Sequence, residues 1–269
     1  CFNAIDPSLG EKLAIMKANG LFDVESRMGK APGGYNYPLA ETGAPFIFMN
    51  SANSLRDLTT MVHEGGHAIH TFLTANLELN DFKHCPSEVA ELASMSMELI
   101  SMDNWNVYFD NEEDLIRAKK EQLADVLKTL PWVAVIDQLQ HWFYTNPNHN
   151  AADREAAFKQ IYTRFGAGFA DWTDFEQQFG NLWQKQLHLF EVPFYYIEYA
   201  IAQLGAIAVW KNYKENPEKA LQQYLDALAL GYTKPMNEIY ETAGIKFDFS
   251  AAYIKELAEF VKDELNKLD

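Results

Sequence analysis

The segment His63-Glu64-Gly65-Gly66-His67 constrains the fold of this chain more than any other part of its sequence. It lies in a stretch that is apolar on most sides, which predicts a buried helix from an N-cap at Ser54 to about residue 77. Two histidines four residues apart on a helix project from one face and can bind the same ion. Neutral imidazole suits Zn²⁺, so this H-E-x-x-H pattern predicts a zinc site.

Glu64 projects in a neighbouring direction, where its carboxylate can deprotonate a zinc-bound water instead of binding the metal. The alternative is two core histidines that only form hydrogen bonds, with an unrelated glutamate between them. Burying these three groups without a cation is costly, which favours the metal site. Gly65 and Gly66 each cost about 1 kcal/mol relative to alanine in a helix, so we expect substrate or a neighbouring backbone to approach closely there.

A catalytic zinc ion needs a third protein ligand and one open position. The next predicted helix begins at Pro86-Ser87, ends near residue 102, and carries Glu88, Glu91 and Glu98 on related turns of one face. Glu91 follows His67 by 24 residues, enough for a helix end, a loop and one turn of an antiparallel helix. Glu88 is the main alternative ligand, and a solvated helix face is the alternative role for Glu88 and Glu98.

Two segments of the chain resemble the thimet oligopeptidase and oligoendopeptidase F family of zinc peptidases. MVHEGGHAIHTFL at residues 61–73 resembles the active-site helix of that family, and SEVAELASMSMEL at residues 87–99 resembles its third-ligand helix. The resemblance implies that His63, His67 and Glu91 hold one Zn²⁺ ion and that Glu98 is a carboxylate that supports them. It also implies that short unstructured peptides are the substrates and that they are cut internally.

The segment from His188 to Ala200 is similar to the part of that family which faces the zinc from the opposite wall of the cleft. The resemblance implies that His188 and nearby tyrosine hydroxyls donate hydrogen bonds to the oxyanion and to the substrate backbone. Tyr195 and Tyr199 are the first choices for this catalytic role, and Tyr196 follows them. For each tyrosine, the alternative is packing in the core.

A Gly/Pro loop punctuated by aromatic residues extends from residue 28 to residue 37. We predict either a surface turn or a substrate-facing loop, with Gly34 and Tyr35 as the candidate substrate-binding residues, because binding residues concentrate on such loops. The loop has no nucleotide-binding glycine spacing.

The rest of the sequence predicts a mostly α fold, a multi-helical zincin-type catalytic domain with little β structure. Residues 45–49 form the one predicted strand before the zinc motif. A long helix is expected after Asp110-Asn111 as far as Tyr144, kinked or divided at Pro131. Further helices are expected at about 151–165, 173–186, 193–215, 217–230 and 250–267.

Composition limits the partners and the compartment. The 38 acidic and 22 basic residues give a net charge of −16, which disfavours nucleic acid and anionic membrane surfaces. No apolar run has the roughly 18 residues that a spanning helix needs. Cys1 and Cys85 are the two cysteines, so no disulfide framework is expected, and the predicted location is the reducing cytoplasm.

The sequence therefore predicts a zinc endopeptidase acting on short peptides, with Glu64 as the general base. Family members are about twice as long as these 269 residues. We therefore expect residues 1–269 to be a catalytic domain that lacks an N-terminal helical half, and that half is a candidate partner. One alternative is a zinc carboxypeptidase or dipeptidase, which needs a cation near the metal; Lys30, Arg56 and Lys83 are the candidates. Another is an inactive metal-binding fragment that acts as an interaction module.

Overall fold

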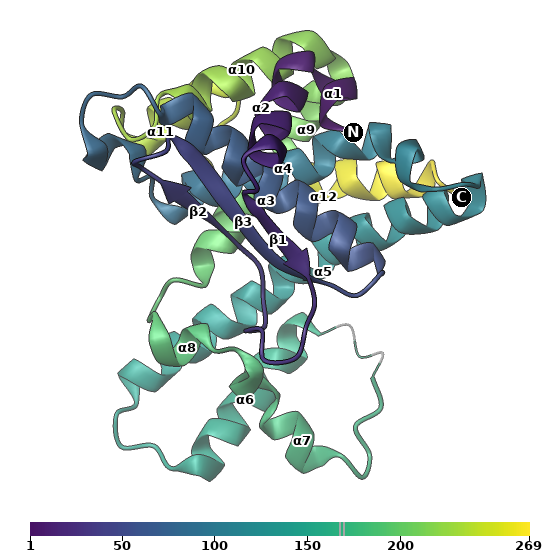
Figure 1. The fold of residues 1–269 in the computed structure, drawn as a ribbon. Helices are drawn as coiled ribbons and strands as arrows, with labels where there is room; N and C mark the ends of the chain where they lie inside the picture. The colour runs from purple at the N-terminus through teal and green to yellow at the C-terminus, as the bar shows by residue number, and fades with distance from the viewer. Residues whose placement is uncertain (167, 169) are drawn as a thin grey trace. The chain divides into compact units, whose positions relative to one another are not determined.

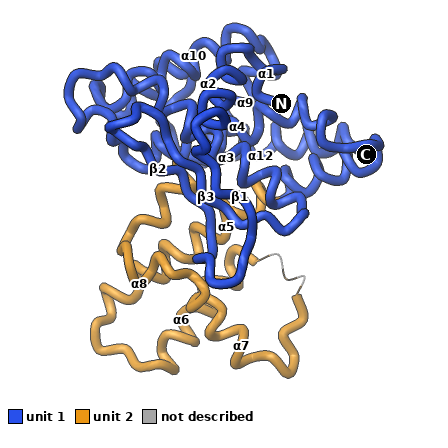
Figure 2. The backbone as a smooth tube through the Cα atoms, in the orientation of Figure 1, with its two compact units in different colours: residues 1–124, 202–269 blue, residues 125–201 orange. Residues whose placement is uncertain are grey.

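The computed structural model describes residues 1–166, 168 and 170–269, which form two compact units (Figures 1 and 2). Unit 1 comprises Cys1–Ala124 and Ala202–Asp269, and unit 2 comprises Asp125–Ile201. Helix α5 (Glu112–Thr145) begins in unit 1 and continues into unit 2, and α9 (Ile197–Glu215) returns the chain to unit 1. The predicted mostly α fold is confirmed.

A small mixed sheet lies in the N-terminal part of unit 1, after helices α1 (Phe2–Ile5) and α2 (Pro7–Ala18). Its strands are β1 (Phe22–Glu25), β2 (Tyr35–Leu39) and β3 (Ala44–Ser51). Their order is β1-β3-β2, with β1 parallel and β2 antiparallel to β3. Strand β2 is therefore an edge strand, and Tyr35 is paired with Phe48 of β3.

Helix α3 (Leu55–Thr74) packs between this sheet and α4 (Ser87–Ser101). A capping box starts α3, in which Ser54 and Asp57 bond to each other's backbone. On the sheet side, Ala68 of α3 packs with Ile47 of β3 and Met16 of α2. The helix is buried because it has apolar neighbours on two sides.

Two tyrosines of the C-terminal helices of unit 1 donate hydrogen bonds to backbone carbonyls of α4. The hydroxyl of Tyr224 donates to the Ala93 carbonyl over 2.6 Å, and that of Tyr240 donates to the Glu88 carbonyl over 3.2 Å. The remaining elements of unit 1 are η1 (Asn80–Lys83), η2 (Met102–Tyr108), α10 (Pro217–Ala229), α11 (Met236–Thr242) and α12 (Ala251–Asn266).

Unit 2 has an aromatic core of its own. Val135 and Leu139 of α5, Phe158 of α6 (Ala151–Phe165) and Trp183 of η3 (Leu182–Lys185) belong to this core. Short helices α7 (Glu176–Gly180) and α8 (His188–Glu191) complete the elements of unit 2.

Several predicted elements differ from the structure. The helix expected at 173–186 is divided into α7 and η3 at Asn181, which leaves the helical conformation with φ −106° and ψ 4°. The helix expected from residue 193 begins at Ile197, because Phe194 adopts a left-handed φ of 62°. The long helix α5 is not divided at Pro131, and β1, β2 and the helices α1, α2, α8 and α11 were not predicted.

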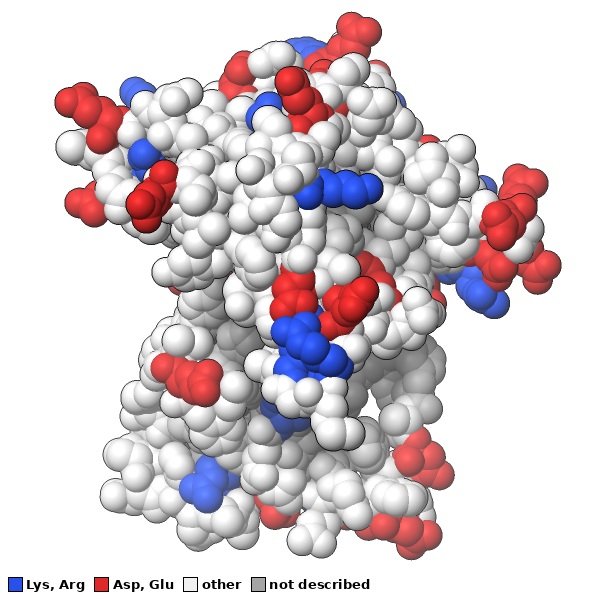
Figure 3. Space-filling model, in the orientation of Figure 1, with Lys and Arg blue, Asp and Glu red and all other residues white. Residues whose placement is uncertain are grey.

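The charged side chains on the surface reflect the net charge of −16 that the sequence carries. Acidic side chains are spread over the face seen in Figure 3 and are not gathered in one patch. In the described part of the chain, no helix combines the length and the apolar character that crossing a membrane requires.

Candidate metal centre

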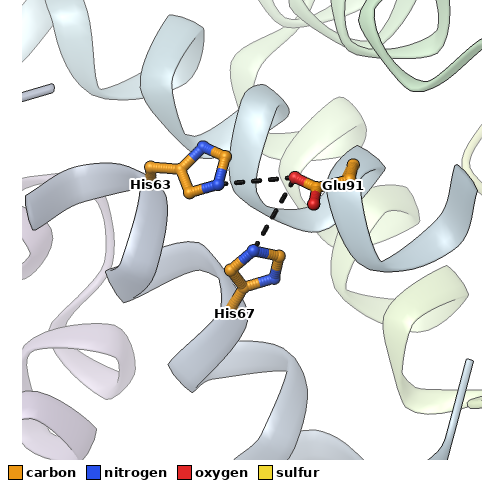
Figure 4. Close-up of side chains that lie close together, drawn as sticks. All are labelled: His63, His67 and Glu91. Atoms are coloured by element: carbon orange, nitrogen blue, oxygen red, sulfur yellow. Dashed lines mark ion pairs between the residues drawn. The ribbon is translucent and has the colours of Figure 1, made fainter. Parts of the chain in front are cut away.

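Helix α3 presents His63 and His67 side by side toward α4 (Figure 4). Their ring centroids lie 4.9 Å apart with the ring planes nearly perpendicular. Glu91 projects from α4 toward both rings, with its Oε2 atom 3.4 Å from His63 Nε2 and 3.8 Å from His67 Nε2. The two helices thus bring two imidazole nitrogens and one carboxylate oxygen to a common point.

This donor set fits a zinc ion. The three ligand atoms lie within 4.8 Å of one another, and within the described residues no other group of three His, Cys, Asp or Glu side chains meets that condition. Two nitrogens and one oxygen are the donors of many catalytic zinc sites, with a position left for water or substrate. Glu88 is outside the group, so the geometry supports Glu91 as the third ligand.

Glu98 lies two turns after Glu91 and contacts His63 from the side away from Glu91. The Nδ1 atom of His63 donates to Glu98 Oε1 over 2.6 Å, which leaves Nε2 for the metal. The second carboxylate oxygen, Oε2, accepts a 2.6 Å hydrogen bond from Gln122 Nε2 of α5. Sequence reasoning missed Gln122, because a single glutamine in a long helix has no motif that marks it.

The metal-free site has strongly shifted pKa values. Burial lowers the pKa of His67 to about 3, so its imidazole is neutral at pH 7, as a ligand must be. Burial alone would lower the pKa of His63, but hydrogen bonds to Glu91 and Glu98 hold it well above its usual range. Burial would raise the pKa of Glu91, yet the two histidines and Ser94 keep it low. The carboxylate of Glu91 is therefore ionised and available to a cation.

Glu64 is buried, with 5% of the residue exposed, and its carboxylate lies outside the ligand group. Its Oε2 atom has no hydrogen-bond partner among the described residues. Burial raises the pKa of Glu64 to about 7, which is suitable for a group that takes up and releases a proton near neutral pH. An unpaired buried carboxylate is costly, and such groups concentrate at functional sites.

The two glycines of the motif allow close packing of α3. A Cβ atom on Gly66 would lie 2.6 Å from the Ala93 carbonyl oxygen and 2.7 Å from Ser94 Cα, both in α4. A Cβ atom on Gly65 would lie 2.4 Å from the ring of Phe2. The expected approach of a neighbouring backbone is thus found at Gly66, where it brings Glu91 within reach of the histidines.

The Gly/Pro loop leads into β2 beside Glu64. A Cβ atom on Gly34 would lie 3.5 Å from Glu64 Oε1, and the Asn36 side chain donates to the Glu64 carbonyl over 3.4 Å. Tyr35 stacks on Phe48 with a centroid distance of 4.8 Å and remains about half exposed. Gly34 therefore lies next to Glu64, and Tyr35 follows it as the first residue of the edge strand β2.

The three cations considered for an exopeptidase have different environments. Only 1% of the Lys30 side chain is exposed. Its Nζ atom donates to Asp23 Oδ1 over 3.0 Å and to the Met49 carbonyl over 2.5 Å, so Lys30 holds the Gly/Pro loop against β1 and β3. Arg56 is exposed. Lys83 donates to the Ala75 carbonyl over 2.8 Å and lines a cavity of about 290 Å³.

Cys85 is not an activated nucleophile. Its Sγ atom lies 3.4 Å from His70 Nε2, but burial raises the pKa of the thiol to about 12 and lowers that of His70 to about 4. The reactive form of cysteine is the thiolate, which this environment disfavours. Both Cys1 and Cys85 are free.

The predicted oxyanion donors form an aromatic cluster within unit 2. His188 Nε2 lies 3.3 Å from the hydroxyl of Tyr199, and the His188 ring stacks on Tyr195 with centroids 5.9 Å apart. Tyr196 also contacts both His188 and Tyr199. The structure therefore brings these four side chains together, and their catalytic role stays a prediction.

The sequence of this chain is similar to those of known peptidases. The model of a family described as peptidase family M3 matches residues 11–259. Oligopeptidase PepF of Bacillus subtilis is 23% identical over 266 residues, which are 97% of this chain and 39% of that protein. An oligoendopeptidase F homolog of Borreliella burgdorferi is 24% identical and covers 84% of this chain and 39% of its own length.

Two solved structures are also similar to this chain. Pz peptidase A with an inhibitor superposes on the entire chain with a TM-score of 0.92 and 30% identity, and the chain covers 47% of it. A putative oligoendopeptidase F superposes with a TM-score of 0.89 and 28% identity, again over 47% of its length. The chain thus spans less than half the length of these relatives.

Proposed function

Because the chain belongs to peptidase family M3, we propose that it hydrolyses internal peptide bonds of short oligopeptides with one zinc ion held by His63, His67 and Glu91. The observation that carries the proposal is the convergence of these three ligand atoms, two of which come from the helix whose buried Glu64 has an Oε2 atom without a hydrogen-bond partner among the described residues. The names of the relatives, oligopeptidase and oligoendopeptidase, support peptides as the substrate class. Since the chain covers 39% of each of these relatives, a further segment of the same protein is a proposed partner in the complete enzyme.

The ligand residues prepare the site for a metal. His67 is neutral and Glu91 ionised, as coordination requires, and Glu98 holds the Nδ1 proton of His63 so that Nε2 faces Glu91. When bound, Zn²⁺ supplies Lewis acidity to a peptide carbonyl and to water.

Glu64 is the proposed general base. Its carboxylate takes a proton from the attacking water and transfers it to the amine that leaves. A pKa of about 7 in the metal-free protein allows both steps near neutral pH. The free Oε2 atom supports this role, because it is not engaged by any described residue.

We propose that the substrate backbone binds along the free edge of β2. Among the described residues, β2 pairs with β3 alone, and both Gly34 just before β2 and Asn36 within it adjoin Glu64. An extended peptide can add to such an edge through main-chain hydrogen bonds, which do not depend on its side chains. Gly34 leaves room beside the base, and Tyr35 offers an exposed ring to a substrate side chain.

We include His188, Tyr195 and Tyr199 in the proposal as donors to the oxyanion, with Tyr196 as a supporting residue. Their mutual contacts in unit 2 support a polar aromatic cluster in which hydroxyl and imidazole groups are positioned by one another. Removing one oxyanion donor typically lowers the rate 10²–10³-fold. The free cysteines are also in keeping with the proposed reducing compartment, the cytoplasm.

Digestion of a mixed peptide library, read by mass spectrometry, tests the proposal. We expect internal cuts by the unchanged chain and none after chelation or in Glu64→Gln. Release of terminal residues only would instead favour the exopeptidase and direct attention to Lys83. Zinc binding without any cleavage would favour the interaction module.

A further inference from the structure

We infer that Gln122 positions the metal ligand His63 by holding the carboxylate of Glu98. Gln122 Nε2 donates to Glu98 Oε2 over 2.6 Å, and Glu98 Oε1 accepts from His63 Nδ1, also over 2.6 Å. One carboxylate thus joins a glutamine of α5 to a histidine of α3. The inference rests on the proposed role of His63 as a zinc ligand.

The chemistry of the three groups fixes the direction of each hydrogen bond. An ionised carboxylate only accepts hydrogen bonds, so the amide of Gln122 must turn its NH₂ group toward Glu98. For the same reason His63 must carry its proton on Nδ1. The Nε2 atom then faces the oxygen of Glu91, which is 3.4 Å away, and is the ring nitrogen that remains available to the metal. Gln122 therefore acts on the ligand atom through two successive bonds.

Both partners of the Gln122–Glu98 hydrogen bond are largely shielded from water, which strengthens the bond. Gln122 has 6% of its surface exposed, and the Glu98 side chain has 17% exposed. Neighbouring residues of α5, Ala118 and Leu123, are buried, so the helix backbone that carries Gln122 is fixed by apolar packing. Without the amide, the Oε2 atom of Glu98 would lose this hydrogen bond and the carboxylate could rotate away from His63.

The expected consequence is a change in metal affinity. Residues that orient the ligands of a metal site typically alter affinity or activity 10–100-fold when they are replaced. Because Gln122 acts one step further out than Glu98, we expect Gln122→Leu to weaken zinc binding about 10-fold and Glu98→Leu to weaken it more. Gln140 provides a matched control: it lies on the same helix, is 2% exposed, and its Nε2 atom has no partner among the described residues.

The experiment measures zinc dissociation constants by chelator competition for the unchanged chain, Gln122→Leu, Glu98→Leu, the double variant and Gln140→Leu. If Gln122 acts through Glu98, the double variant binds zinc no more weakly than Glu98→Leu alone. The absorption spectrum of the Co²⁺-substituted protein should change in Gln122→Leu and stay the same in Gln140→Leu. If Gln122→Leu does not fold, Gln122→Met is used, because it keeps the length of the side chain without the donor.

Each result discriminates. Unchanged zinc affinity in a folded Gln122 variant contradicts the inference, and so does an equal loss with and without Glu98, which would indicate a packing role. Both outcomes leave the proposed peptidase function intact. Failure of the unchanged chain to bind zinc contradicts the inference and the proposed function together.

Discussion

Glu64 is the residue on which the proposed reaction depends most directly. Replacing it with glutamine keeps the size of the side chain but removes the base, and the ligand group contains no atom of residue 64. We expect Glu64→Gln to retain its zinc and to lose turnover by at least 10²-fold, within the usual range for a general base. Metal content and kcat measured on the same preparation test this. Loss of zinc in the variant would contradict the separation of base and ligands.

The same substitution should change the pH dependence of stability in the metal-free protein. Burial raises the pKa of Glu64 from 4.5 to about 7, so in this pH window the unfolded chain has lost a proton that the folded chain keeps. Stability therefore falls as the pH rises through this window, by up to about 3 kcal/mol for this group. Glutamine has no such proton. Urea denaturation with chelator should show Glu64→Gln gaining stability relative to the unchanged chain between pH 4.5 and 7; a constant difference would contradict it.

At the scale of elements, the contact of α3 with α4 sets the distance from the histidines to Glu91. Gly66→Ala would place a methyl group 2.6 Å from a backbone oxygen of α4, so the helices must separate. We expect a loss of about 1–3 kcal/mol in stability and weaker zinc binding. Gly65→Ala is the control, because its methyl group meets the side chain of Phe2 on α1 and not α4. Equal zinc affinities in the two variants would argue against this account.

The sequence predicts best those elements whose periodicity and caps agree. Ser54 begins α3 as expected, and α4 begins at Ser87. Strands β1 and β2 were missed because Asp23 and Pro38 are poor strand residues, and pairing with β3 outweighs that preference. The start of α9 was misplaced because the left-handed backbone at Phe194 has no signal in the sequence.

At the scale of the whole molecule, the spacing of His63 and His67 predicted a shared ion, and the family resemblance of residues 87–99 selected Glu91 over Glu88; the fold brings the three together. The partners of that group are non-local: Gln122 lies 24 residues after Glu98 and reaches it only because α5 returns beside α4. The division of the chain at Asp125 and Ile201 also has no linker composition that marks it, since both borders fall inside helices.

Zinc should therefore stabilise the molecule unevenly. All three proposed ligands lie in unit 1, so binding to the folded state should protect α3 and α4 most strongly against hydrogen exchange. At a zinc concentration of 100 times the dissociation constant, the free energy of unfolding rises by about 2.7 kcal/mol. Hydrogen exchange by mass spectrometry, with and without zinc, measures it peptide by peptide, with α6 of unit 2 as the internal reference. The protection that zinc gives against hydrogen exchange should vanish in His67→Ala. Equal protection of α3 and α6, or protection that persists in this variant, would mean that zinc binds elsewhere.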